Sequence, residues 1–159
     1  MRGAQAMPDS IAFELRRAGP ADAEAIAALT REAYAKWIPV IGRAPKPMTA
    51  DYDVAVREHL IDLLYAQGVF VALVECIRHP DHLLIENLAV SPSQQGRGYG
   101  RTLLAHAEDL ARAFDITEVR LYTNKRFAEN VAFYAKQGYR LDGETPFKDG
   151  FVVHMSRRL

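Results

Sequence analysis

The chain has 159 residues, with 20 basic and 20 acidic side chains and a formal net charge of zero. This balance argues against a nucleic-acid partner, since a general nucleic-acid binder carries an excess of basic residues. No apolar run approaches the ~20 residues of a membrane-spanning helix, so no membrane partner is expected, and the single cysteine, Cys76, favours a reducing, cytoplasmic location. The length predicts one domain over residues 11–159, after a flexible N-terminal tail over residues 1–10 that lacks the hydrophobic segment of a signal peptide.

The first half of the chain predicts one strand followed by two helices. Apolar and polar residues alternate over residues 11–15, as in a half-buried strand. A helix with an apolar face over residues 26–37 comes next, and then a loop with three prolines over residues 38–48. Thr49 is expected to cap a second helix over residues 50–67.

The second half predicts strands that alternate with helices. A long amphipathic helix begins near Tyr99 and a short helix ends before Gly138, a residue typical of a helix C-terminus. The predicted strands cover residues 69–77, 83–90 and 117–122, a short stretch after Tyr139, and residues 151–155 after a loop over residues 141–150. The predicted order is therefore β-α-α-β-β-α-β-α-β-β.

A glycine-rich turn joins the strand over residues 83–90 to the long helix. Glycines at positions 96, 98 and 100 remove the Cβ atoms that would keep a ligand from the backbone. The first N–H groups of the helix have no intrahelical partner, and the helix dipole adds partial positive charge there. The turn therefore predicts a phosphate or pyrophosphate site.

Three phosphate-binding patterns compete for this turn. A P-loop needs Gly-Lys-Ser/Thr, but Gly100 is followed by Arg101 and Thr102. The dinucleotide fingerprint needs a glycine where Arg101 stands. The third pattern, Gln/Arg-x-x-Gly-x-Gly/Ala, fits Gln95, Gly98 and Gly100.

A second motif, ENVAFYAKQGYR, follows downstream and contains Glu129, Asn130, Tyr134 and Gly138. With both motifs in this order, the chain resembles the GNAT superfamily of acyl-CoA-dependent N-acetyltransferases. The resemblance implies an α+β (mixed α/β) fold, in which about four helices flank a twisted, mostly antiparallel sheet with a splayed parallel strand pair. It also implies acetyl-CoA as co-substrate, an amine acceptor, no metal, and allows a homodimer.

The family motif places the cofactor on the strand, the turn and the short helix. The residues that the resemblance assigns to cofactor binding are Leu88, Ala89, Val90, Gln95, Gly96, Arg97, Gly98, Tyr99, Gly100, Arg101, Asn130 and Tyr134. For Arg97 and Arg101, contact with phosphate oxygens and simple solvation are both open. Asn130 either contacts CoA or caps its helix, because many family members carry the CoA-contacting Asn where this chain has Phe127.

Two residues are candidates for proton transfer. Tyr134 matches the position of the family's acid and would protonate the departing thiolate; its alternative role is ring packing. Glu86 stands inside the apolar run LLIENLAV and is expected to share a face with Leu88, so it would deprotonate the amine directly or through water, unless it is a rim carboxylate paired with an arginine. Asn87 is expected on the opposite face, in a structural role. The oxyanion donor is expected to be a backbone N–H near Leu88.

The acceptor is not identified by the sequence. Aromatic rings with carboxylates suit a small amine, whereas the basic residues would receive an anionic group on an amino-acid-like substrate. The acceptor-side residues implied by the resemblance are Tyr34, Trp37, Arg43, Lys46, Met48, Tyr52, Asp142, Glu144 and Asp149. The family has two strands before the strand at 83–90, and only residues 69–77 fit here, so either a strand is missing or part of the segment over residues 60–67 replaces it. If the missing strand has closed the acceptor groove, the chain is instead a non-catalytic acyl-CoA-binding module.

The remaining reactive side chains have no evident catalytic partner in the sequence. The five histidines show no metal-ligand spacing, and surface or packing roles are expected for them. Cys76 lies in a strand pattern without a nearby base, so a structural role is expected.

Overall fold

The computed structural model describes residues 12–159, so the predicted tail and Ile11 lie outside the described residues. The strands are β1 (Phe13–Arg17), β2 (Leu60–Ala66), β3 (Val69–Arg78), β4 (Leu83–Val90), β5 (Glu118–Asn124), β6 (Arg140–Phe147) and β7 (Gly150–Arg158). The α-helices are α1 (Ala23–Tyr34), α2 (Ile38–Ile41), α3 (Tyr52–Glu58), α4 (Tyr99–Ala113) and α5 (Ala128–Lys136). Short 3-10 turns precede α1, α2 and α3 and open the glycine-rich segment.

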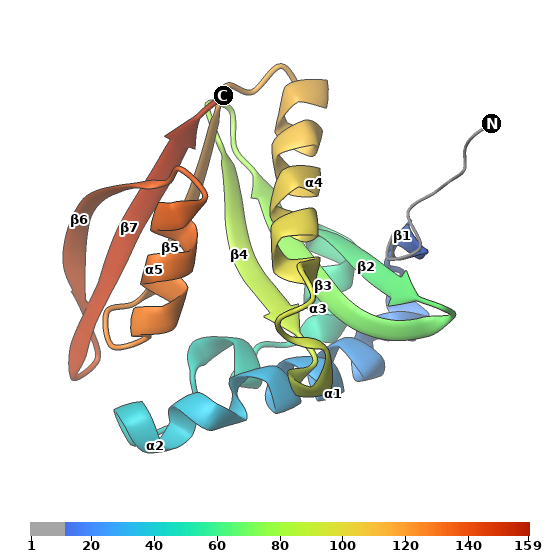
Figure 1. Cartoon of the computed structure of the whole chain (residues 1–159), viewed down its shortest axis with the longest axis horizontal. Coiled ribbons are helices and arrows are strands. Elements are labelled where there is room, and N and C mark those ends of the chain that lie inside the picture. The colour runs from blue at the N-terminus through green and yellow to red at the C-terminus, as the bar shows by residue number, and fades with distance from the viewer. Residues whose placement is uncertain (1–11) are drawn as a thin grey trace.

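The seven strands form one sheet in the order β1-β2-β3-β4-β5-β7-β6. β4 and β5 pair in parallel, and every other neighbouring pair is antiparallel. Figure 1 shows β4 and β5 close together at one end and far apart at the other. The predicted fold class, a mostly antiparallel sheet with a splayed parallel pair and flanking helices, is confirmed.

Both faces of the sheet are covered, and each has its own apolar cluster. On β3, Ala72 and Val74 belong to the cluster beneath α4, whereas Leu73 between them packs with α1 and α3. This alternation follows from the two-residue period of a strand. α4 contributes buried Leu103, Leu104, Ala107 and Ala111 to the first cluster, as the predicted helical spacing requires.

The predicted second helix is wrong in its second half. Asp51, and not Thr49, caps α3, because its side chain accepts hydrogen bonds from the amides of Asp53 and Val54. The helix ends at Glu58, and residues 60–66 form β2 between β1 and β3. The apolar residues of this segment fit a helical face, but they fit a strand buried on both faces equally well, and pairing with two neighbours decides the outcome. Of the two alternatives for this region, the one in which part of residues 60–67 supplies the strand is confirmed.

Two predicted loops also contain regular structure. The four-residue helix α2 lies inside the proline-rich segment. The predicted loop over residues 141–150 is mostly β6, which pairs with β7 from Arg140 to Phe147. Pro146 is tolerated because β6 is an edge strand, where a missing N–H leaves no neighbour unpaired.

The short helix α5 ends as predicted at Gly138. This glycine has a left-handed backbone (φ 95°), and the amide of Tyr139 donates to the carbonyl of Tyr134 at 3.0 Å. Together these features complete the helix end and carry the chain into β6.

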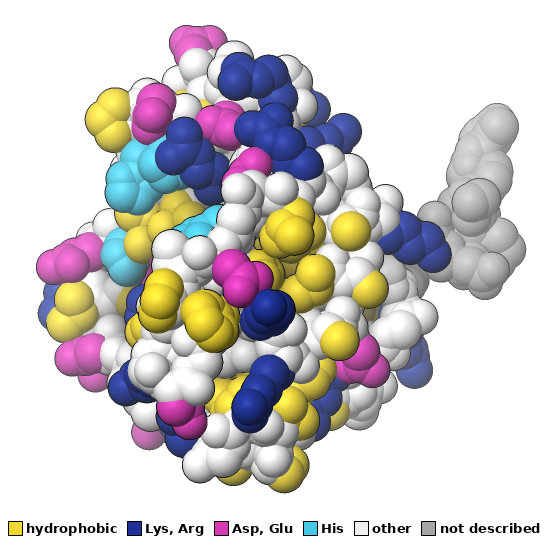
Figure 2. All heavy atoms as spheres, turned by 90° about the vertical axis from the view of Figure 1, so that its left-hand side faces the viewer, with side chains coloured by type: hydrophobic (Ala, Val, Ile, Leu, Met, Phe, Trp, Pro, Cys, Tyr) yellow, Lys and Arg dark blue, Asp and Glu magenta, His cyan; other side chains and the backbone are white. Residues whose placement is uncertain are grey.

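The surface on the side of α5, β6 and β7 mixes the two charge signs. Figure 2 shows acidic and basic side chains interspersed over this face with small hydrophobic areas between them. Leu141 and Phe151 are among the exposed large hydrophobic residues. Within residues 12–159, none of the helices combines the length and the apolar character that crossing a lipid bilayer requires.

Candidate functional site

The parallel pairing of β4 and β5 is short. It covers only three residue pairs, from Leu83 with Val119 to Ile85 with Leu121. Beyond Ile85 the strands diverge, and α1 and α2 lie at the open end of the gap (Figure 1). Within the described part of the chain, the edge of β4 that faces β5 consequently has no strand partner from Glu86 onward.

A β-bulge marks the point of divergence. On β3, Glu75 pairs with Asn87 and the next residue, Cys76, pairs with Ile85, so Glu86 is the extra residue of β4. Because a bulge shifts the alternation of side chains by one, Glu86 and Asn87 both line the same cavity. The expectation that Glu86 shares a face with Leu88 and that Asn87 points the other way is therefore wrong. A bulge leaves no signal in the sequence pattern here.

The glycine-rich turn presents unpaired backbone amides. Gly96 and Gly98 have left-handed backbones (φ 83° and 87°), and Gly98 caps α4 without a side-chain hydrogen bond. Among the described residues, none accepts a hydrogen bond from the N–H groups of residues 96–101. Gln95 ties the turn to the strand through a hydrogen bond from its Nε2 to the carbonyl of Val90 (3.2 Å).

A groove of about 420 Å³ runs past this turn, between β4, α4 and α5. We call it the glycine-turn groove. It is lined by Ala33, Tyr34, Lys36, Trp37, Leu88, Ala89, Val90, Gln94, Gln95, Gly96, Gly98, Tyr99, Gly100, Arg101, Glu129, Asn130, Phe133 and Tyr134. Gly100 lies close to α5, because a Cβ at this position would stand 3.5 Å from the ring of Phe133.

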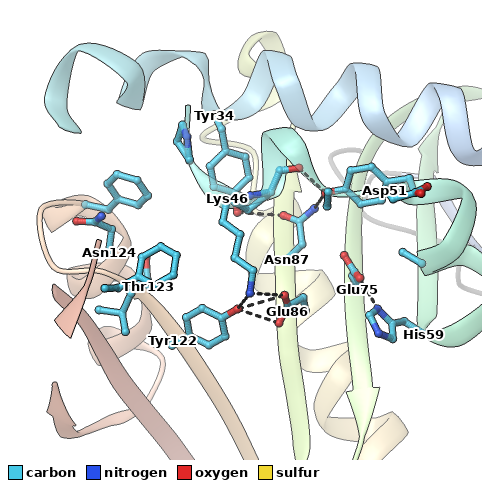
Figure 3. A pocket seen from close by; sticks show the side chains of 18 of the residues that line it. Tyr34, Lys46, Asp51, His59, Glu75, Glu86, Asn87, Tyr122, Thr123 and Asn124 are labelled. Atoms are coloured by element: carbon cyan, nitrogen blue, oxygen red, sulfur yellow. Dashed lines mark hydrogen bonds and ion pairs between the residues drawn. The ribbon is translucent and has the colours of Figure 1, made fainter. Parts of the chain in front are cut away.

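A second cavity, of about 340 Å³, lies where β4 and β5 have separated. We call it the splay cavity. Its walls come from the α1–α3 region, from β3, β4 and β5, and from Phe127, Phe147 and Val152. Figure 3 shows its polar groups converging from these elements.

Three side chains form a hydrogen-bonded cluster in the splay cavity. Lys46 Nζ donates to the hydroxyl of Tyr122 at 2.7 Å and lies 3.3 Å from a carboxylate oxygen of Glu86. The Tyr122 hydroxyl is 3.1 Å from both oxygens of Glu86. Partial burial alone would lower the pKa of Lys46, but the hydrogen bond to Tyr122 and the charge of Glu86 outweigh it and raise this pKa. Lys46 is thus a firmly protonated partner of Glu86. Figure 3 shows its amine beside the Glu86 carboxylate and the Tyr122 hydroxyl.

A second acid–base pair lies deeper in the same cavity. Glu75 is 3% exposed, and its Oε2 lies 2.6 Å from His59 Nδ1. Burial raises the pKa of Glu75, against the opposing effect of His59. The histidine was expected to have a surface or packing role, and Glu75 was not singled out in the sequence. The signal was present, since Glu75 interrupts the apolar run VFVALVECI as Glu86 interrupts LLIENLAV.

Tyr34 lines both hollows and lies between them. Its hydroxyl donates to Asn87 Oδ1 at 3.0 Å, and Asn87 in turn donates to Thr30 and to Tyr52. Burial, together with neighbouring Tyr134, raises the pKa of Tyr34 well above its usual range. Across the shared wall stands Tyr134, which lines the glycine-turn groove and is buried, so that desolvation raises its pKa too. Its ring packs edge-on against Phe133 and Tyr139.

A comparison with known protein families decides the assignment, because the model of the acetyltransferase (GNAT) family matches residues 25–139. The chain belongs to the GNAT family. Among curated proteins, the uncharacterized protein YxbD of Bacillus subtilis is 40% identical over 48 residues, and this stretch is 30% of each chain. The match therefore spans less than a third of that relative's length.

Solved GNAT structures share the fold of the chain. The PaiA N-acetyltransferase of Thermoplasma acidophilum, in complex with coenzyme A, superposes with a TM-score of 0.79 at 19% identity, covering 94% of this chain and 100% of that one. The ribosomal-protein-S18-alanine N-acetyltransferase of Escherichia coli gives 0.73 at 20% identity, covering 92% and 94%. Identities this low show the fold alone.

The GNAT cofactor residues expected from the motif mostly lie together. All of them except Arg97 line the glycine-turn groove. Arg97 is exposed beside the turn, whereas Arg101 lines the groove with an exposed side chain. Asn130 does not cap α5, because the N-cap position is Phe127. Asn130 instead lines the glycine-turn groove. Phe127 instead stacks on Trp37, with ring centroids 4.4 Å apart.

The acceptor-side residues expected from the GNAT resemblance are only partly brought together. Tyr34, Arg43, Lys46 and Tyr52 line the splay cavity, and Trp37 lines the glycine-turn groove. Four line neither hollow: Met48 in the 3-10 turn before α3, Asp142 and Glu144 on β6, and Asp149 in the turn between β6 and β7. Cys76 is buried in β3, which raises the pKa of its thiol to about 12. Among residues 12–159, no group of three His, Cys, Asp or Glu side chains is arranged to hold a metal ion.

Proposed function

We propose that the chain is an N-acetyltransferase that moves the acetyl group of acetyl-CoA directly to a primary amine, either of a small molecule or of a protein amino terminus. Membership of the GNAT family supports the reaction class. The observation that carries the proposal is the meeting of two hollows at Tyr34, one beside the glycine-rich turn and one at the divergence of β4 and β5. Such an arrangement lets a donor and an acceptor reach the same point from two sides.

The turn fits the diphosphate of acyl-CoA. Amides of residues 96–101 are unpaired at the start of α4, where the helix dipole favours an anion. A Cβ on Gly98 would stand 3.3 Å from Arg101 Nη2, so glycine leaves this guanidinium close to the backbone amides. The unpaired edge of β4 offers further backbone groups to the pantetheine arm. The PaiA relative is a complex with coenzyme A, in keeping with this fit. When bound, acetyl-CoA supplies a thioester with an electrophilic carbonyl carbon.

Tyr134 is the proposed proton donor to the departing sulfur. A free phenol has a pKa of about 10 against about 8.5 for a thiol, so donation is already uphill in water. Burial raises the pKa of Tyr134 further, so its hydroxyl remains protonated throughout the physiological pH range. The proton must therefore move as charge develops on the sulfur, and not before.

Glu86 is the proposed base for the acceptor ammonium. It is the first residue of β4 past the parallel pairing, and its side chain is 19% exposed. The rim-carboxylate alternative predicted an arginine partner, but Lys46 and Tyr122 are the partners observed. An acceptor ammonium can take the place of the Lys46 ammonium beside Glu86. It would then transfer a proton to the Glu86 carboxylate, directly or through water. A backbone N–H near Leu88 or Ala89 is the proposed oxyanion donor.

The alternative, a non-catalytic acyl-CoA-binding module, is no longer favoured. It depended on a missing strand that closed the acceptor groove, whereas β2 is present and the splay cavity is open. A homodimer and a cytoplasmic location remain predictions.

The test has two steps. Calorimetric titration should give saturable binding of acetyl-CoA, and a free-thiol assay with a panel of primary amines should give acceptor-dependent release of CoA. Binding without release for any amine would favour the binding module, and no binding at all would remove both proposals.

A further inference from the structure

The charged groups of the splay cavity are almost all paired. Of its three carboxylates, Glu75 contacts His59, Glu86 contacts Lys46 and Tyr122, and Asp51 caps α3. The cation Lys46 is likewise held, and it is the group that an incoming ammonium would replace. A ligand that enters this cavity therefore meets no unpaired carboxylate among the described residues.

Arg43 is the least satisfied of these charged groups, because its salt bridge to Asp149 is long and its buried Nε lacks a hydrogen bond within residues 12–159. The facing carboxylate oxygen, Asp149 Oδ1, lies 3.6 Å from Nε, too far for a hydrogen bond, and the side chain of Asp149 is 75% exposed. A buried donor without a partner is costly, so this guanidinium is suited to an anionic partner that enters the cavity.

The position of Arg43 is fixed by its surroundings. The left-handed backbone of Gly42 (φ 76°) ends α2 immediately before it. Arg126 Nη1 donates to the carbonyl of Val40 at 3.2 Å, which ties the end of α2 to the segment before α5. The Arg43 guanidinium carbon lies 5.6 Å from the ring centroid of Phe147. The guanidinium is thus held against an aromatic wall, in the same cavity as Glu86.

We propose that the acceptor carries a carboxylate as well as its amine, and that Arg43 binds this carboxylate. The inference rests on the proposed acetyl transfer and names its substrate class. The planar fork of arginine matches a carboxylate with two parallel hydrogen bonds. A cavity of about 340 Å³ with walls from Ile41, Pro45, Phe127 and Phe147 suits a compact, largely apolar amino acid. The sequence left open whether the basic residues receive an anion, and the buried Nε of Arg43, which makes no hydrogen bond within residues 12–159, favours Arg43 for this role.

The experiment uses matched acceptors: apolar and aromatic L-amino acids, their amides, and the amines that lack the carboxylate. The ratio of kcat/KM for acid over amide is compared in the wild type and in Arg43→Gln, so that differences in amine basicity cancel. We expect the wild type to favour the acid and Arg43→Gln to reduce this ratio by about 10- to 100-fold, the range for a lost hydrogen bond to a charged group. Arg31→Gln, an exposed arginine on α1, is the matched control and should leave the ratio unchanged.

Each outcome has a separate meaning. If amines are acetylated but acids have no advantage, or Arg43→Gln keeps the wild-type ratio, the inference is wrong and the proposed function stands. If no amine is acetylated, the proposed acetyl transfer is wrong, and calorimetric titration of the CoA-bound protein with the amino acids tests the carboxylate site by itself. Binding that Arg43→Gln abolishes supports the carboxylate site, whereas no binding overturns the carboxylate site as well as the transfer. Acetyl-CoA affinity and thermal unfolding of each variant show whether it is folded.

Discussion

The hydroxyl of Tyr34 donates a hydrogen bond to Asn87 Oδ1 at 3.0 Å, and this contact joins α1 to β4 at the wall shared by the two hollows. Asn87 is 2% exposed and also donates to Thr30 and Tyr52. A buried amide with all these partners holds its strand and helix in one arrangement. The relative position of the groove and the cavity thus depends on a polar network in an otherwise apolar cluster.

Replacing Tyr34 with phenylalanine should remove this contact and leave the ring in place. The free energy of unfolding should fall by about 1–3 kcal/mol, because the carbonyl of Asn87 loses a buried donor. Urea denaturation measures the change, and a double-mutant cycle with Asn87→Ala isolates the pairwise part. Additive effects of the two substitutions would show that the contact is not energetically coupled.

Replacing Tyr134 with phenylalanine should separate catalysis from binding. Turnover should fall by about 10²- to 10⁴-fold, as for loss of a general acid, while the Kd for acetyl-CoA changes little because the ring still packs against Phe133 and Tyr139. Tyr65→Phe, outside both hollows, is the control for loss of a hydroxyl. Wild-type turnover in Tyr134→Phe would reduce this residue to a packing role.

Replacing Gly98 with alanine should weaken acetyl-CoA binding. The backbone is left-handed there, and the new Cβ would stand 3.3 Å from Arg101 Nη2, beside the unpaired amides. We expect a Kd raised by about tenfold or more, together with a stability cost of about 1–3 kcal/mol.

Gly68→Ala is the matched control for this substitution. Gly68 has a similar φ of +81° in the turn between β2 and β3, and, apart from its chain neighbours, none of residues 12–159 comes within 4 Å of its Cβ position. Gly68→Ala should lower the free energy of unfolding by a similar amount, because its backbone is equally left-handed, but it should leave the Kd for acetyl-CoA unchanged. Equal Kd values in the two variants would argue against phosphate binding at the turn.

The sequence predicted the glycine-rich turn and the helices α4 and α5 well. Motifs there are local: the glycines must adopt the backbone that the turn requires, and the periodicity of α4 is long enough to be unambiguous. Gly138 likewise marked the end of α5 correctly. The N-terminal half was harder because β2 is defined by its neighbours, and its apolar run fits a helix or a buried strand.

The splay cavity could not be predicted from the sequence. It depends on the bulge at Glu86 and on contacts between distant segments, such as the 2.7 Å hydrogen bond from Lys46 to Tyr122. Glu75 and Glu86 could be recognised in the sequence as candidate site residues, because each is an acid within an otherwise apolar strand. Their partners, His59 and Lys46, come from other elements, and no local pattern links them.

Replacing Glu86 with glutamine should test the base. The amide keeps the size of the side chain and can still contact Tyr122, but it removes the negative charge beside Lys46. We expect kcat/KM to fall by about 10²-fold or more with an unchanged Kd for acetyl-CoA, measured by thiol release and calorimetry. Glu144→Gln on β6, outside the cavity, is the control. A change of less than about twofold in Glu86→Gln would leave a water chain as the route for the proton.

Replacing Glu75 with glutamine should change how stability depends on pH. Burial raises the pKa of Glu75 in the folded protein, with His59 and Lys46 opposing and Glu86 adding to the shift. As pH rises from the ordinary glutamate pKa, about 4.3, through the higher folded value, the unfolded chain loses this proton first, so the stability that Glu75 contributes declines across that window. Glu75→Gln should lack this decline, whereas Glu58→Gln, exposed at the end of α3, should retain it. Urea denaturation at a series of pH values measures the difference, and parallel curves for wild type and Glu75→Gln would show that the buried carboxyl does not titrate in this window.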